Sequence, residues 1–383
     1  MARDGLSRPY ADPALRRSPR LYASVLKRLR EASLVAWGVE CKVSVGIFAA
    51  YKKSGKLRVI IDSRISSCWF DDSDAVHLAS GSSFASIQAG SQDPICVGGV
   101  DVANAFYNAA LPKGLQEFFG LPRIRAGQVG VSEVNGAPVA PNTYIAPLFT
   151  AIPMGWKLSL WPMQRALEIL SRRAPGIEEA NALFDRRPAP PLTPLIHTEC
   201  VDNFVGFSQC QRAAGDAARA VSSELTRARF PAHPVEGTRG GATLGWTFSD
   251  DSAEVGVNPT TCWKLRLGFQ EFARRKYASG KTVEILVSHF TTRALIRREL
   301  LCVFNAAYSF IEHAGDSAVP FWPSVKREFT WASHLIVLAS RDLSAPWASE
   351  VSVVDASSWG MGACVQDLDH RVVADLGKLN ERW

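Results

Sequence analysis

The stretch HTECVDNFVGFSQC, residues 197–210, places an Asp-Asn pair between two runs of strand-forming residues, with a glycine close behind. This pattern predicts a β-hairpin that has Asp202 and Asn203 at its tip. A two-residue turn requires positive φ angles, which Asp and Asn adopt more readily than any residue except glycine. Turn geometry alone therefore explains the pair. A carboxylate in an apolar stretch also indicates a bound cation or metal, because it is costly to bury without a partner.

A second carboxylate follows a predicted central strand. The segment PICVGGVDVANAF, residues 94–106, carries apolar residues on both faces, as strands inside a sheet do, and the strand is expected to end at Asp101. Two carboxylates that are brought together can bind Mg²⁺, which prefers oxygen ligands and leaves positions open for phosphate oxygens. Asp101 and Asp202 are therefore the first candidates for a metal site.

Helices and strands are both predicted along the rest of the chain. Residues 56–62, KLRVIID, alternate as a half-buried strand with a basic outer face. Residues 21–37 predict a helix. The other predicted elements are helices over 158–174 and 211–229, paired strands over 240–258, a largely helical region over 264–340 and a strand pair over 350–367.

The composition is that of a globular protein. The 383 residues are enough for two or three domains, with 47% hydrophobic and 21% charged residues. No apolar run approaches the roughly 18 residues of a membrane span, so no membrane partner is expected. The eight cysteines match neither a zinc site nor a disulfide framework. Free thiols favour a reducing, intracellular location, the cytoplasm or the nucleus.

Positive charge is concentrated in two zones. Residues 1–30 hold eight Lys and Arg against two Asp, which accounts for the whole net charge of +6. Residues 261–300 hold nine Lys and Arg against three Glu. Such clusters fit a polyanionic partner, and they fit a solvated tail and a solvated helix face equally well.

Several segments, taken in order, resemble the motifs of a reverse transcriptase. They are KSGKLRVIIDSR (53–64), VDVANAFYNAALPKGLQEFFGL (100–121), AIPMGWKLSLWPMQRALE (151–168), CVDNFVGF (200–207), LGWTF (244–248), FWPSVKREF…LSAPW (321–347) and VVDASSWGMGACV (353–365). The resemblance covers residues 45–383 and is strongest to reverse transcriptases of DIRS-like and gypsy-like retrotransposons.

This resemblance implies an α+β fold of the right-hand polymerase type, with fingers, palm and thumb. The palm would be an antiparallel sheet backed by helices, followed by the start of an RNase H-like domain. The implied domains are a basic N-terminal arm and helix (1–40), fingers and palm (41–260), a helical thumb and connection (261–349) and a truncated RNase H-like start (350–383).

The implied activity is RNA-directed DNA polymerisation, a nucleotidyl transfer that uses two divalent ions, Mg²⁺ or Mn²⁺. The implied partners are an RNA or DNA template with its primer, and deoxynucleoside triphosphates. Asp101 and Asp202 would ligate the metals, and the Val102 carbonyl would be an additional ligand. Asn203 would complete the catalytic hairpin.

The resemblance also assigns residues to the substrates, although such aromatic and glycine residues are ordinarily core or turn residues. The assigned residues are Lys56 and Arg58 for the triphosphate, Phe106 against a ribose 2′-hydroxyl, Met154, Gly155 and Trp156 beside the nascent base pair, and Gly245 and Trp246 for the primer end.

The sequence departs from the family pattern at several positions. Asn203 stands where the family usually has a second Asp, which removes a negative charge from the metal site. Leu158 replaces a small residue. His233 is a weak candidate for the general acid that protonates pyrophosphate. Asp355 matches the first carboxylate of an RNase H site and Glu381 matches the second, which is too few for nuclease chemistry, so RNase H activity is not expected.

Two further hypotheses remain beside the polymerase. The chain is alternatively a catalytically inactive, nucleic-acid-binding remnant of a retroelement polymerase, or an unfolded product of a decayed element copy. Metal-dependent nucleotide incorporation would distinguish the polymerase from the inactive remnant. A cooperative melting transition would argue against an unfolded product.

Overall fold

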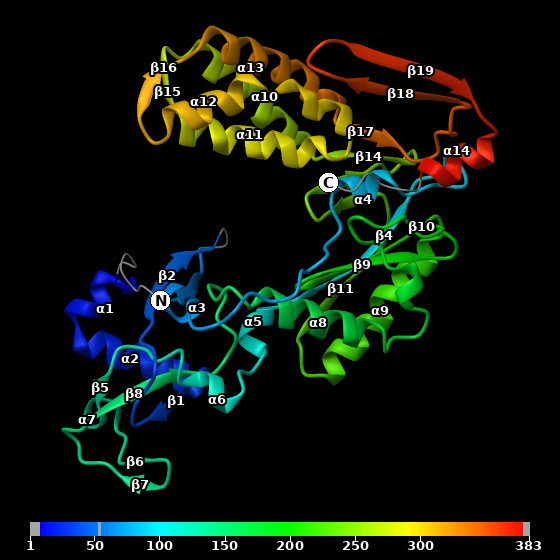
Figure 1. Cartoon of the computed structure of the whole chain (residues 1–383). Coiled ribbons are helices and arrows are strands. Elements are labelled where there is room, and N and C mark those ends of the chain that lie inside the picture. Colours follow the sequence, from blue (N-terminus) through cyan, green and yellow to red (C-terminus); the bar gives the residue numbers. More distant parts are fainter. Residues whose placement is uncertain (1–7, 53–54, 378–383) are drawn as a thin grey trace. The chain divides into compact units, whose positions relative to one another are not determined.

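The computed structural model describes residues 8–52 and 55–377 (Figure 1). The chain forms two compact units, each built from three separate segments. Unit 1 comprises Met1–Val76, Val102–Ile169 and Leu225–Ala232, and unit 2 comprises His77–Asp101, Leu170–Glu224 and His233–Trp383. Antiparallel strand pairs and helices occur in both units, so the predicted α+β class is confirmed.

The sheet that carries the two candidate aspartates lies in unit 2. Its strand order is β11 (Ala232–Arg239), β4 (Cys96–Val102), β10 (Asn203–Ser208) and β9 (Ile196–Cys200). Helix α9 (Gln211–Arg227) packs so closely on β4 that a Cβ on Gly98 would lie 2.2 Å from the Ala214 carbonyl oxygen. Glycine at this position is therefore what allows the helix to cover the sheet.

A second sheet and a group of helices share one hydrophobic core in unit 2. The sheet is ordered β12 (Gly241–Thr243), β13 (Trp246–Phe248), β14 (Glu254–Val257) and β17 (Ser340–Asp342). The helices beside it are α10 (Pro259–Arg274), α11 (Gly280–Ala294), α12 (Ala306–Ala314) and α13 (Pro323–Leu335) (Figure 1). Edge-to-face contacts among Phe269, Phe290 and Phe329 lie at their centre.

Glu328 on α13 caps the start of α12. Its buried carboxylate accepts hydrogen bonds from the backbone N–H groups of Asn305, Ala306 and Ala307, at 3.1, 2.7 and 2.8 Å. These N–H groups have no partner within the helix, and the helix N-terminus favours a negative charge. One side chain thus satisfies three orphan donors and joins two helices.

Unit 2 contains several further elements. They are α4 (Gly81–Ala85), η1 (Glu179–Asn181), β15 (Tyr277–Ser279), η2 (Arg298–Val303), β16 (Ala318–Pro320), η3 (Ile336–Leu338), β18 (Glu350–Ala356), β19 (Met361–Asp367) and α14 (His370–Gly377). Strands β18 and β19 form a two-stranded hairpin whose residues are almost all exposed, with Trp359 in its turn 96% exposed.

Unit 1 contains a three-stranded sheet ordered β1–β8–β5 and two hairpins, β2–β3 and β6–β7. Its elements are α1 (Pro13–Arg17), α2 (Pro19–Glu31), β1 (Val35–Gly38), β2 (Gly46–Tyr51), β3 (Leu57–Asp62), α3 (Arg64–Ser67), α5 (Ala105–Asn108), α6 (Lys113–Gln116), β5 (Ile124–Arg125), α7 (Ala126–Val129), β6 (Glu133–Val134), β7 (Ala137–Pro138), β8 (Tyr144–Phe149) and α8 (Leu160–Ser171), which continues into unit 2.

The single helix predicted over residues 21–37 is wrong at its C-terminal end. Helix α2 ends at Glu31, Ser33 has a φ of 59°, and β1 begins at Val35. The strand forms because Val35 and its neighbours pair with β8, where Val35 lies opposite Phe149. A partner more than a hundred positions away thus overrides the local helical period.

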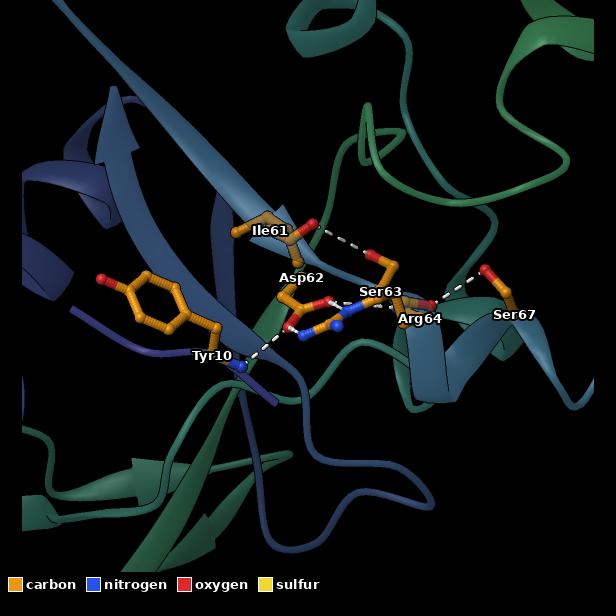
Figure 2. Close-up of polar contacts among 6 residues, drawn as sticks. All are labelled: Tyr10, Ile61, Asp62, Ser63, Arg64 and Ser67. Atoms are coloured by element: carbon orange, nitrogen blue, oxygen red, sulfur yellow. Dashed lines mark hydrogen bonds and ion pairs between the residues drawn. The ribbon is translucent and has the colours of Figure 1, made fainter. Parts of the chain in front are cut away.

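Asp62 at the end of β3 organises three segments of unit 1, as Figure 2 shows. Its carboxylate accepts two hydrogen bonds from the guanidinium of Arg64, at 2.8 and 2.7 Å, and one from the backbone N–H of Tyr10 at 2.7 Å. The hydrogen bonds from Arg64, aided by that from Tyr10, lower the pKa of Asp62 to about 2. The bonds fix the N-terminal segment and the start of α3 on the β2–β3 hairpin.

Within the described part of the chain, no helix is both long and apolar enough to cross a membrane. All eight cysteines lie in that part and are free thiols, as predicted.

Candidate active site

The predicted hairpin is present, but its tip is shifted by one residue. Strand β9 ends at Cys200 and β10 begins at Asn203, so Val201 and Asp202 form the two-residue turn. Asn203 is the first residue of β10 and lies opposite Asp101 of β4. Pairing with β4 draws Asn203 into the sheet. The positive φ expected for Asp and Asn falls on Val201, at 59°.

A β-branched residue is poorly suited to this backbone conformation, because its Cβ clashes with the adjacent backbone. Such residues cost on the order of 1–3 kcal/mol and cluster at functional sites. We expect Val201→Gly to stabilise the chain by about 1 kcal/mol, after allowance for the greater freedom of glycine in the unfolded state. The denaturant midpoint measures this gain. Val201→Ala, which keeps a Cβ, should gain less stability. A larger gain for alanine than for glycine would contradict the inference that Val201 is strained.

Three polar residues lie near the same end of this sheet. Asp101 is exposed and lies directly across from Asn203 in the β4–β10 pair, while Asp202 occupies the adjacent turn. The Asn203 Nδ2 donates a hydrogen bond to Oδ1 of Asp202 at 2.8 Å. The strand register thus places Asp101 close to the turn that holds Asp202, about a hundred positions further along the chain. The role of the two carboxylates as metal ligands stays a prediction.

This set of donors suits a hard divalent cation. Carboxylate and amide oxygens are ligands that Mg²⁺ accepts, and Mg²⁺ usually binds one or two carboxylates and keeps positions for phosphate and water. Among residues 8–52 and 55–377, however, no cluster of three or more His, Cys, Asp or Glu side chains could hold a metal. A metal here would rest on Asp101 and Asp202, with amide and backbone oxygens as further donors.

A buried histidine–carboxylate pair supports the hairpin from β9. His197 and Glu199 are both fully buried, with 3.0 Å between His197 Nδ1 and Glu199 Oε1. The His197 ring stacks on Phe204 of β10, and its Nε2 lies 2.9 Å from the carbonyl oxygen of Glu178. Sequence reasoning missed this pair, although its two-residue spacing in a strand places both side chains on one face.

The pair makes stability depend on pH. Burial lowers the pKa of His197, but Glu199 and the Glu178 carbonyl outweigh it and the pKa is raised. Stability from protonated His197 is therefore complete below its unfolded pKa of about 6.5 and is lost as pH rises through the folded value. Denaturation measured between pH 6 and 9 should show this loss, at no more than about 1.4 kcal/mol per pH unit. Glu199→Gln should abolish the dependence, and an unchanged profile would contradict it.

The predicted triphosphate and base-pair residues lie in unit 1. Lys56 and Arg58 are exposed on the β2–β3 hairpin, and Phe106 lies half-buried in α5. Trp156 is buried against Phe119, with the ring centroids 5.3 Å apart, so its side chain belongs to the core.

The loop at Met154 and Gly155 packs against β3. A Cβ on Gly155 would lie 2.7 Å from the Ile61 carbonyl oxygen, so the fold itself requires glycine here. Met154 is half-buried beside it, and so is Leu158. The proposed contact of this loop with a nascent base pair stays a prediction.

The predicted primer-grip residues lie in unit 2, where Gly245 is in the turn between β12 and β13 and Trp246 is the first residue of β13. Gly245 has a φ of 85°, and Trp246 is buried against Phe84 with the Arg293 guanidinium over its ring. The Trp246 side chain is thus part of the core, and the contact of these residues with a primer stays a prediction. His233 is exposed on β11.

Asp355, the first candidate of the RNase H-like segment, is exposed on β18 opposite Gly362. Glu381, the second candidate, lies outside the described residues. Val102 follows Asp101 within β4 and is buried.

Comparison with known proteins supports the fold. No protein-family model matches the chain, and no curated protein matches its sequence. It is similar to the structure of the foamy viral protease-reverse transcriptase dRH in complex with double-stranded DNA. The TM-score is 0.61 and the sequence identity is 14%, and the match covers 93% of this chain and 54% of that one. It is also similar to a second structure of the foamy viral protease-reverse transcriptase in complex with double-stranded DNA. The TM-score is 0.59 and the sequence identity is 14%, and the match covers 96% of this chain and 66% of that one.

The chain thus spans between 54% and 66% of the length of these two structures. The predicted reverse-transcriptase type of fold is confirmed. The assignment to DIRS-like or gypsy-like elements stays a prediction.

Proposed function

We propose that the chain is an RNA-directed DNA polymerase of a retroelement. The observation that carries this proposal is the β4–β10 register, which sets Asp101 opposite Asn203 and beside the turn that holds Asp202, on a fold of the reverse-transcriptase type. Its substrates would be a primed RNA or DNA template and deoxynucleoside triphosphates.

Asp101 and Asp202 would hold two Mg²⁺ or Mn²⁺ ions, with the Val102 carbonyl as a further ligand. Bound ions would act as Lewis acids on the attacking 3′-hydroxyl and the leaving pyrophosphate. The exposed Arg58 and Lys56 would bind triphosphate oxygens, for which the guanidinium fork is well shaped. Phe106 would exclude a ribose 2′-hydroxyl by its bulk. The RNase H-like segment would contribute no nuclease activity.

Asn203 makes the metal site weaker than one with three carboxylates. Its amide carries no charge, and it already donates a hydrogen bond to an oxygen of Asp202. We therefore expect Asn203→Asp to lower the metal concentration needed for half-maximal activity by several-fold, because each added carboxylate strengthens cation binding. A metal titration of primer extension measures this, and a requirement that rises instead would contradict it.

The experiment that tests the function is primer extension on an RNA template, with Mg²⁺ and Mn²⁺ in parallel and a chelator as the blank. Metal-dependent incorporation by the native chain supports the proposal. Incorporation only by Asn203→Asp would identify an intact fold that one residue disables. The bond between Asn203 and Asp202 favours a second candidate function, an inactive nucleic-acid-binding remnant, which is indicated if neither protein extends the primer yet both bind it.

A further inference from the structure

Unit 1 contains a cavity of about 500 Å³ that the proposed polymerisation does not use. The residues that line it come from α1, α2, β2, β5, α7 and the start of β8, and from the segments next to them. Figure 1 labels these elements. Its inner wall is apolar, formed in part by Ile47, Ile124 and the buried ring of Tyr22, whose hydroxyl is occupied by a hydrogen bond to the Pro122 carbonyl. Cavities of this size accept small organic ligands and single nucleotides.

The rim of the cavity is basic. Arg16, Arg123 and Arg125 line it and are all exposed, and no Asp or Glu is among the described residues of the lining. Arg123 also lies 3.5 Å from Glu40, an exposed pair that binds weakly and leaves the guanidinium available. Three guanidinium groups around one opening indicate an anionic ligand, because their forks match phosphate oxygens.

An aromatic platform stands at the same opening. Tyr144 is 53% exposed and lies opposite Arg125 in the β5–β8 pair, which puts both side chains on one face. The Arg125 guanidinium lies 5.6 Å from the centre of the Tyr144 ring. A stacking ring beside phosphate-binding arginines is the combination that binds one base and its phosphate in single strands.

We propose that this cavity binds one nucleotide of a single-stranded nucleic acid, with the base against Tyr144 and the phosphate at Arg125 and its neighbouring arginines. The proposal goes beyond the polymerase function, because none of these residues belongs to the candidate active site and single-strand binding requires no metal or chemistry.

The test uses the full chain and a single-stranded tetranucleotide of thymidine that carries one 5-iodouracil, which crosslinks to nearby aromatic side chains under light. We expect the adduct on Tyr144, identified by mass spectrometry of the peptide. Arg125→Gln should reduce its yield at least about tenfold, the lower end of the effect of losing a hydrogen bond to a charged group. Arg28→Gln, the same change at an exposed arginine of α2 outside the cavity, should leave the yield unchanged.

The yields are compared only among variants whose melting curves match that of the native chain. Tyr144→Phe keeps the aromatic ring and should therefore keep the crosslink. No adduct on Tyr144, or equal yields for Arg125→Gln and Arg28→Gln, would overturn the proposal. The proposal would also be overturned if inorganic phosphate competed with the crosslink as strongly as the tetranucleotide without iodouracil does. The cavity would then be a site for anions in general. Stronger competition by thymidine triphosphate would assign it to free nucleotides instead. The adduct forms whether or not the chain extends a primer, so this result is independent of the polymerase test.

Discussion

Asp101→Asn will lower primer extension by about a thousandfold or more. The substitution keeps the size of the side chain but removes one of two carboxylates at the end of the β4–β10 pair. Metal ions contribute several kcal/mol to such a transition state, and about 4 kcal/mol corresponds to a factor of about a thousand. Because Asp101 is exposed, the fold should survive, which separates loss of chemistry from loss of structure. Initial rates at saturating Mg²⁺ measure the effect.

The matched control is Asp216→Asn. Asp216 is an exposed aspartate in unit 2, on α9, where it pairs with Arg212 and Arg219. The variant loses the same charge at a position away from the end of the β4–β10 pair, and it should retain full activity. If both variants retained activity, the assignment of Asp101 to the metal site would be wrong.

Glu328→Ala will destabilise the chain by at least about 3 kcal/mol. The carboxylate satisfies three backbone N–H groups at the start of α12, and each buried donor that loses its acceptor costs on the order of 1–3 kcal/mol. The loss also separates α12 from α13, so the helical part of unit 2 should unfold first. Chemical denaturation followed by circular dichroism measures the change.

Two further variants show whether the lost stability comes from the helix cap. Glu328→Gln keeps one acceptor oxygen and should cost less than alanine. Glu312→Ala, at an exposed glutamate on α12, removes the same charge and should cost little. Equal costs at both glutamates would show that the loss arises from the general change of charge and not from the cap.

Local patterns were sufficient for most elements and for the existence of the β9–β10 hairpin. Residues 197–207 predicted two paired strands and the apolar segment before Asp101 predicted a third, and all three strands are present in one sheet. The exact turn was not predictable, because Asn203 is held in β10 by its pairing with Asp101, a partner far along the chain. The strand at Val35 was missed for the same reason.

The supporting contacts were beyond sequence reasoning because they are formed between distant segments. Nothing local marks the Tyr10 N–H as a partner of Asp62, 52 positions away. The burial of Trp246 depends on Gly81 and α4, since a Cβ on that glycine would lie 2.6 Å from the indole. The family resemblance likewise did not indicate that the Trp246 ring would be enclosed.

The pairing of β4 with β10 has a consequence for how the chain is made. A ribosome that has completed Val102 must add 101 more residues before Asn203 is in the chain, which takes roughly 5–20 s at typical translation rates. During that interval the apolar strand CVGGV has no neighbour and presents unpaired backbone to other nascent chains. Slower initiation, or a chaperone that holds this segment, should therefore improve the soluble yield more than any change in the finished protein.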